Sequence, residues 1–200
     1  MTDNLKSIIW EIDNLENIGG NKVTVLGSPK VIDSARGKAI EFDGTKDGLI
    51  IDDCPLAGID KFTIEVIFKP YANGLEEQRF VHLQEENTES RVLIELRSAN
   101  NEWFFNTFIK SGETNQVLSA KDFKHQTDVW YHGALVFDGK EMRHYVNGIK
   151  EMSAEIKFTP LEKGKTSIGV RINQVSWFKG AIKEIHFTPE VIQPEDFIQI

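Results

Sequence analysis

The segment Arg91–Arg97 combines residue types that could do chemistry with the alternation of a β-strand. Side chains alternate between the two faces of a strand, so Arg91, Glu95 and Arg97 share one face while three aliphatic side chains share the other. Two guanidinium groups of this kind could bind a carboxylate ligand in a planar, bidentate geometry. The same stripe could instead be cross-strand ion pairing on an exposed sheet, which is worth little at a surface. The sequence leaves both interpretations open.

Neighbouring segments are expected to add polar side chains to this face. If Val81 and Leu83 point into the core, alternation turns Phe80, His82 and Gln84 toward the stripe. The residues predicted to line one trough are His82, Gln84, Arg91, Glu95, Arg97, Tyr145, Arg171 and Asn173. The residues expected at its edge, as platforms for sugar stacking, are Trp103 and Trp177.

These motifs resemble in part those of jelly-roll polysaccharide lyases that cleave alginate. The Arg-x-Glu-x-Arg motif appears with two residues inserted, His82-Leu83-Gln84 reverses the Gln-x-His motif, and Phe108–Gly112 lacks the tyrosine of the third motif. The resemblance implies that Arg, Gln or Asn side chains neutralise a uronate carboxylate, while Tyr or His transfers the C5 proton. Our candidate catalytic residues are His82, Arg91, Glu95 and Tyr145. Our candidate ligand-binding residues are Gln84, Arg97, Trp103, Arg171, Asn173 and Trp177.

The paired carboxylates of a retaining glycosidase are not evident. Such enzymes need two carboxylates about 5 Å apart, which on a strand requires acidic residues at alternate positions. The similar triplet here, Glu11-Ile12-Asp13, has Leu15 where the second Glu would stand. We also find no phosphate-binding glycine loop, zinc-ligand spacing or nucleophile elbow.

Many short strand-like runs, each closed by turn residues, must position these side chains. Asp138-Gly139 and Asn147-Gly148 flank one such run and are strong signals for two-residue hairpin turns. This pattern predicts an all-β sandwich or barrel. Helix signals are confined to Asn4–Asn14, a short helix or an edge strand, and to Pro194–Phe197, where Pro suits a first helical position.

Four segments resemble the laminin-G-like jelly roll of the concanavalin-A-like lectin/glucanase superfamily. They are Gly37–Leu49, Phe62–Pro70, Trp130–Gly148 and Ser167–Ile185. The resemblance covers residues 36–188 and implies a two-sheet antiparallel jelly-roll sandwich, with residues 1–200 forming one domain. This fold hosts lectins, glycosidases, lyases and adhesion modules. We therefore expect a carbohydrate-binding module; the alternatives are a carbohydrate-active enzyme acting on an acidic sugar and a non-catalytic protein-interaction module.

The chain departs from the family pattern at two positions. Lys183 stands where many relatives carry an acidic residue that helps to bind calcium, a cation that prefers several oxygen ligands. We therefore predict no cofactor, and the loop carboxylates that could still hold calcium are more simply turn residues: Asp43, Asp47, Asp52 and Asp53. His144 stands at an aliphatic position and is expected to be a core histidine rather than a catalytic one.

The net charge, the single cysteine and the N-terminal segment limit the classes of partner and the cellular compartments that we expect. The 200 residues carry a net charge of −8, which disfavours binding to nucleic acid, so a glycan or small saccharide is the expected partner. Cys54 is the single cysteine, which excludes an intramolecular disulfide and suggests a buried, idle thiol. Met1–Ile9 lacks the features of a signal peptide, and no membrane insertion is predicted. The sequence therefore predicts a cytoplasmic protein, although a secreted or periplasmic protein whose leader had been removed would show the same sequence features.

Overall fold

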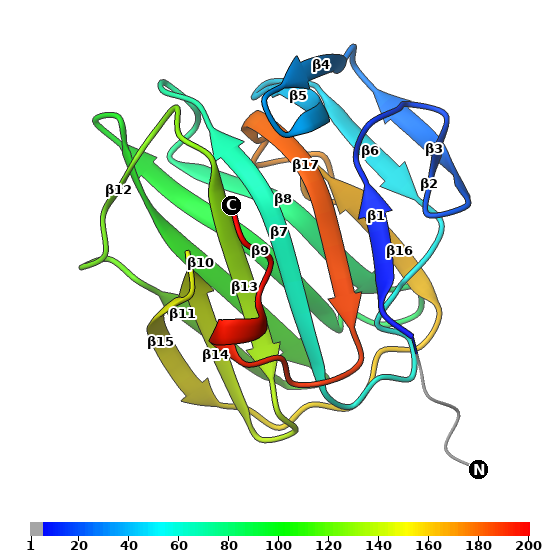
Figure 1. The fold of residues 1–200 in the computed structure, drawn as a ribbon. Helices are drawn as coiled ribbons and strands as arrows, with labels where there is room; N and C mark the ends of the chain where they lie inside the picture. Colours follow the sequence, from blue (N-terminus) through cyan, green and yellow to red (C-terminus); the bar gives the residue numbers. More distant parts are fainter. Residues whose placement is uncertain (1–5) are drawn as a thin grey trace.

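The computed structural model describes residues 6–200 as two antiparallel sheets stacked face to face (Figure 1). The eight-stranded sheet has the order β15 (Ile149–Glu155), β14 (Glu141–Val146), β13 (Tyr131–Phe137), β7 (Phe62–Pro70), β17 (Lys179–Thr188), β5 (Gly37–Asp43) and β4 (Lys30–Ser34), with β1 (Ile8–Glu11) also paired to β17. The nine-stranded sheet has the order β11 (Thr114–Ser119), β10 (Glu102–Ser111), β9 (Arg91–Ala99), β8 (Glu77–Glu85), β16 (Gly164–Ile168), β6 (Gly48–Ile51), β3 (Asn21–Leu26) and β2 (Asn17–Ile18), with β12 (His125–Gln126) paired to β10.

The predicted jelly-roll sandwich is confirmed, including its short terminal helix. A 3-10 helix, η1, covers Pro194–Asp196, and β1 confirms the edge-strand alternative for part of the N-terminal segment. Asn4 and Leu5 lie outside the described residues. Within residues 6–200, no helix combines the length and apolar character needed to cross a membrane.

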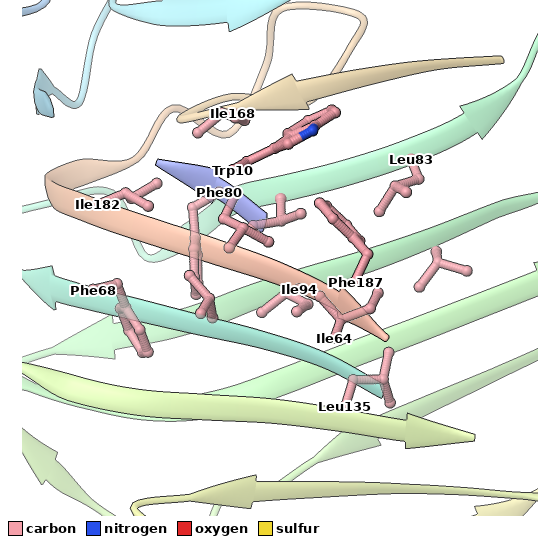
Figure 2. Close-up of a cluster of buried hydrophobic side chains, with 14 of the residues drawn as sticks. Trp10, Ile64, Phe68, Phe80, Leu83, Ile94, Leu135, Ile168, Ile182 and Phe187 are labelled. Carbon is pink, nitrogen blue, oxygen red and sulfur yellow. The ribbon is translucent and has the colours of Figure 1, made fainter. Parts of the chain in front are cut away.

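The core lies between the sheets and is rich in aromatic side chains (Figure 2). Phe68 of β7 stacks on Phe80 of β8 with ring centroids 4.7 Å apart, and it meets Trp103 of β10 edge-on at 5.3 Å. Such aromatic pairs stabilise a core beyond the area that they bury. Cys54 is buried as predicted, and burial raises the pKa of its thiol to about 11.

A β-bulge in β8 changes which side chains reach the outer face of the nine-stranded sheet. Arg79 pairs with Glu95 and Val81 pairs with Ile94, so Phe80 is an extra residue between them. Both Phe80 and Val81 therefore point into the core, where they are fully buried. The prediction that Phe80 shares a face with His82 is wrong, because the bulge interrupts the alternation.

Two further predicted trough residues lie elsewhere. Trp103 has no exposed surface and packs in the core, where its indole N–H donates to the carbonyl of Gln126. Tyr145 belongs to β14 of the other sheet and packs under Phe197, with ring centroids 5.2 Å apart. The expectations that Tyr145 lines one trough with Arg91 and that Trp103 stands at its edge are therefore wrong. His144 lies in the core as predicted, with Nδ1 3.1 Å from the Thr107 hydroxyl.

The segment after β17 returns across the outer face of the eight-stranded sheet, in front of β7 and β13 in Figure 1. The Thr63 hydroxyl donates to the Glu190 carbonyl and accepts the Ile192 N–H. Glu65 accepts the Ile198 N–H at 2.8 Å and lies 2.9 Å from His132 Nε2. One outer face of the sandwich is thus partly covered by the chain itself.

Candidate functional site

The Arg91–Arg97 stripe lies on the outer face of the nine-stranded sheet, as its alternation predicts. Val92, Ile94 and Leu96 are fully buried between the sheets. The opposite side chains of β9 point outward beside those of β8 and β10. The sheet therefore gathers charged side chains from three neighbouring strands on one surface.

Half of this stripe is an ion-pair cluster. Glu95 is 3% exposed, and its Oε2 lies 2.8 Å from Arg79 Nε and 3.5 Å from Arg97 Nη1. Glu77 lies 3.2 Å from the Arg79 guanidinium and 3.5 Å from that of Arg97. Two carboxylates thus balance two guanidinium groups, and the cross-strand ion-pairing interpretation holds for this part.

A pocket of about 430 Å³ opens beside this cluster on the same face. Its wall includes Arg97, Phe104, Asn106 and Lys124. Asn106 is 2% exposed, and its side-chain oxygen Oδ1 has no hydrogen-bond partner. The Lys124 ammonium lies 4.3 Å from the centre of the Phe104 ring. The pocket therefore offers an aromatic surface, cationic groups and an unsatisfied amide acceptor, the mixture found in small-ligand sites.

Sequence reasoning missed Phe104, Asn106 and Lys124. Phe104 and Asn106 pair with Arg97 and Glu95 across the β9–β10 register. Alternation along β10 places Phe104 and Asn106 on one face, and the burial of Trp103, seen only in the structure, shows that this face points outward. Lys124 follows β11 in a turn, and no pattern in the sequence marks it.

The other end of the stripe carries a second group of cations, near His82. His82 is 1% exposed, and its Nδ1 accepts the Ile172 N–H at 3.1 Å. Burial, followed by the charges of Arg171, Arg91 and Arg79, lowers the pKa of His82 to about 3, and a hydrogen bond with the Gln84 side chain opposes part of this shift. The imidazole is therefore neutral at physiological pH, which does not suit a proton donor.

The remaining predicted residues lie in or beside the loop after β16. Arg171 is half-buried, Asn173 is exposed, and Gln84 pairs with Arg91 and Lys165 across the register of the sheet. Trp177 is half-buried, and its ring lies within 3.5 Å of the position that a Cβ on Gly48 would take. The structure thus brings together His82, Gln84, Arg91, Glu95, Arg97 and Arg171, but not Tyr145 or Trp103.

No tyrosine lies on the stripe. Tyr131 is a core residue that donates to the Gln126 carbonyl, and Tyr71 donates to Glu41 of the other sheet. Tyr145 is covered by Phe197. The assignment of Tyr145 as the proton-transferring tyrosine of a lyase-like site is therefore wrong.

Asp43 and Asp47, two of the acidic loop residues, accept hydrogen bonds from backbone N–H groups. Burial alone would raise the pKa of Asp43, but hydrogen bonds from the Thr45 hydroxyl and from three backbone N–H groups lower it to about 2. Asp47 accepts the backbone N–H groups of Ser28 and Asp43. Lys183 lies 3.0 Å from Glu184. Backbone hydrogen bonds thus occupy carboxylate oxygens of both Asp43 and Asp47.

Acid should destabilise the fold through His82. The unfolded histidine binds a proton near its ordinary pKa of 6.5, whereas the folded one does so only near 3. The contribution of His82 is complete above about pH 6.5 and is lost as the pH falls toward 3. The expected slope is up to about 1.4 kcal/mol per pH unit. Urea unfolding of the wild type and of His82→Gln at pH 7 and pH 4 measures it. The variant should lose less stability than the wild type, and equal losses would contradict the assignment.

Two stacked antiparallel sheets, connected in this order, define a jelly-roll β-sandwich of the concanavalin A type. The model of the concanavalin A-like lectin/glucanases superfamily matches residues 43–196, and the chain belongs to this family. The resemblance noted in the sequence is thereby confirmed. A comparison with curated protein sequences found no match.

Solved structures with the same fold include two that were solved with a bound oligosaccharide. Domain 4 of AbnA, a GH43 extracellular arabinanase from Geobacillus stearothermophilus solved with arabinotriose, has a TM-score of 0.71 at 18% identity, covering 95% of each chain. The Ruminococcus gnavus IT-sialidase CBM40 bound to alpha2,3 sialyllactose has a TM-score of 0.62 at 15% identity, covering 79% of this chain and 93% of that one. The binding domain of Paraclostridial Mosquitocidal Protein 1 has a TM-score of 0.69 at 12% identity, covering 96% of this chain and 50% of that one. At these identities the likeness concerns the fold.

Proposed function

We propose that this chain is a glycan-binding module, and that a sugar residue occupies the pocket beside Arg97. The observation that carries the proposal is the pairing of an aromatic ring, Phe104, with the unpartnered Oδ1 of buried Asn106 in one pocket. A sugar ring has an apolar face of C–H groups and a rim of hydroxyl groups. The pocket offers a surface for the first and a hydrogen-bond acceptor for the second.

The unsatisfied amide favours a polar ligand over an apolar one. A buried acceptor without a partner costs about 1–3 kcal/mol, and a hydroxyl donor placed against it would recover that cost. Arg97 and Lys124 at the same pocket are additional donors to ring or hydroxyl oxygens. The carbohydrate-bound structures of similar fold support a glycan as the ligand class.

Replacing Phe104 by Ala is expected to weaken glycan binding about tenfold or more. Burying a phenylalanine side chain against a ligand is worth about 1.5–3 kcal/mol, and 1.4 kcal/mol corresponds to a factor of ten. Isothermal titration calorimetry against a panel of neutral and acidic oligosaccharides measures the affinity. Phe123→Ala is the matched control, because Phe123 is 41% exposed and does not line the pocket. The proposal fails if no oligosaccharide binds, or if Phe104→Ala binds as tightly as the wild type.

A further inference from the structure

Among the described residues, Arg91 and Arg171 lack the carboxylate partners that their neighbours have. Arg79 and Arg97 pair with Glu77 and Glu95, as described above, and Lys110 lies 2.6 Å from Glu89. No carboxylate of residues 6–200 lies within ion-pair distance of either Arg91 or Arg171. Arg91 donates to the backbone carbonyl of Glu89 rather than to its side chain. The outer face therefore carries two guanidinium groups that form no direct ion pair, although the Glu89 and Glu95 carboxylates lie near enough to oppose the lowering of the Arg91 pKa by burial and by Arg171.

The fold holds these two guanidinium groups near each other. Arg91 stands on β9 opposite Gln84, two residues from His82 along β8. The hydrogen bond from Ile172 N–H to His82 Nδ1 ties the loop after β16 across β8, which brings the preceding residue, Arg171, to the same place. Burial and then the charge of Arg171 lower the pKa of Arg91. Like charges repel, and Glu89, the nearest carboxylate, is in direct contact with Lys110, so an anion that contacts both guanidinium groups would relieve their repulsion.

The same place has hydrogen-bond donors without acceptors. Because His82 Nδ1 accepts a backbone N–H, its neutral ring carries the hydrogen on Nε2, which is buried and lacks an aligned partner. Nε of Arg91 is also buried without a partner, while its guanidinium lies 5.1 Å from the centre of the Phe108 ring. Buried donors are normally satisfied, and each exception calls for an explanation such as a bound group.

We propose that Arg91 and Arg171 form an anion-binding subsite that holds the carboxylate or sulfate oxygens of a sugar, which makes the ligand an acidic oligosaccharide. This inference rests on the proposed glycan-binding function. Arginine forks suit both oxyanions, because two parallel N–H donors match two oxygens. Arg91 and Arg97 lie six residue steps apart along β9, a distance of about 20 Å at the rise of a strand. One oligosaccharide of several residues could reach from the pocket to the subsite.

The test compares acidic with neutral oligosaccharides of equal length. Calorimetry would use an oligouronate, a sulfated oligosaccharide and a neutral oligosaccharide with the wild type, Arg91→Gln and Arg171→Gln. Each substitution should weaken binding of the acidic ligand about tenfold, because hydrogen bonds to charged groups contribute about 1.5–3 kcal/mol. Binding of the neutral ligand should not change. Comparing the two acidic ligands identifies the preferred oxyanion. Arg36→Gln is the matched control, because Arg36 is an exposed arginine in the turn between β4 and β5.

A second measurement separates this subsite from the glycan-binding function. Free glucuronate and free sulfate should raise the melting temperature of the wild type and of Phe104→Ala, but not that of Arg171→Gln. Stabilisation by these anions without binding of any oligosaccharide would overturn the proposed function and leave the subsite in place. Equal affinity for acidic and neutral oligosaccharides, unchanged in Arg171→Gln, would overturn the subsite and leave the glycan-binding function in place.

Discussion

The Phe68→Ala variant is expected to unfold with a free energy about 3–5 kcal/mol below that of the wild type. Phe68 is fully buried, and its ring lies within 6.3 Å, centre to centre, of four aromatic rings. Three of these belong to the nine-stranded sheet, so Phe68 joins the two layers. Removing its ring leaves a cavity that rigid aromatic neighbours cannot easily fill.

Urea unfolding at pH 7 measures the loss, with Phe123→Ala as the control. Phe123 undergoes the same chemical change at an exposed position, so that variant should lose less than about 1 kcal/mol. A Phe68→Ala variant as stable as the control would show that the aromatic cluster does not join the sheets.

The Glu65→Ala variant should lose a similar amount of stability, because it removes a buried carboxylate that accepts two hydrogen bonds. Glu65 and His132 are both nearly fully buried, and the Glu65 carboxylate also accepts the Ile198 N–H. Removing the carboxylate leaves the buried His132 Nε2 and the Ile198 N–H without a partner, each at a cost of about 1–3 kcal/mol. The substitution also frees Ile198 and so loosens the C-terminal segment from β7.

Glu65→Gln is the matched variant, because an amide oxygen can still accept the Ile198 N–H. It should lose clearly less stability than Glu65→Ala. Hydrogen exchange should show faster exchange at Ile192–Ile200 in Glu65→Ala than in Glu65→Gln. Equal exchange in both variants would mean that Glu65 does not hold this segment.

The class of fold could be predicted from the sequence because alternation and turn residues are local signals. The outward stripe of β9 followed from alternation alone, since one of its faces is purely aliphatic. β10 was ambiguous, because both of its faces carry aromatic residues: Trp103 and Phe105 face inward, whereas Phe104 and Phe108 face outward. Alternation cannot say which aromatic face is buried, and the pocket was missed for that reason.

The other errors had non-local causes. Tyr145 has a suitable position within its strand, but alternation does not reveal to which sheet a strand belongs. The strand order that separates β14 from β9 depends on contacts between distant segments. The bulge at Phe80 could not be predicted from the sequence either. An extra residue in one strand is recognised only when its pairing with the neighbouring strand, here β9, is known. Sequence reasoning therefore identified Arg91, Glu95, Arg97 and Arg171 on the outer face, but it missed the ion-pair partners Glu77 and Arg79.

The bulge also indicates how strand β8 would respond to a change in length. On either side of Phe80, Arg79 and His82 keep to the outer face, while Gln78 and Val81 keep to the interior. A chain lacking Phe80 would therefore alternate regularly with every other side chain on its present face. Such a deletion would preserve the pairing of Arg79 with Glu95 and would remove the ring that stacks on Phe68. The deletion would also remove the carbonyl that accepts the Gly169 N–H, so it would alter both the interior and the anchoring of the loop that carries Arg171.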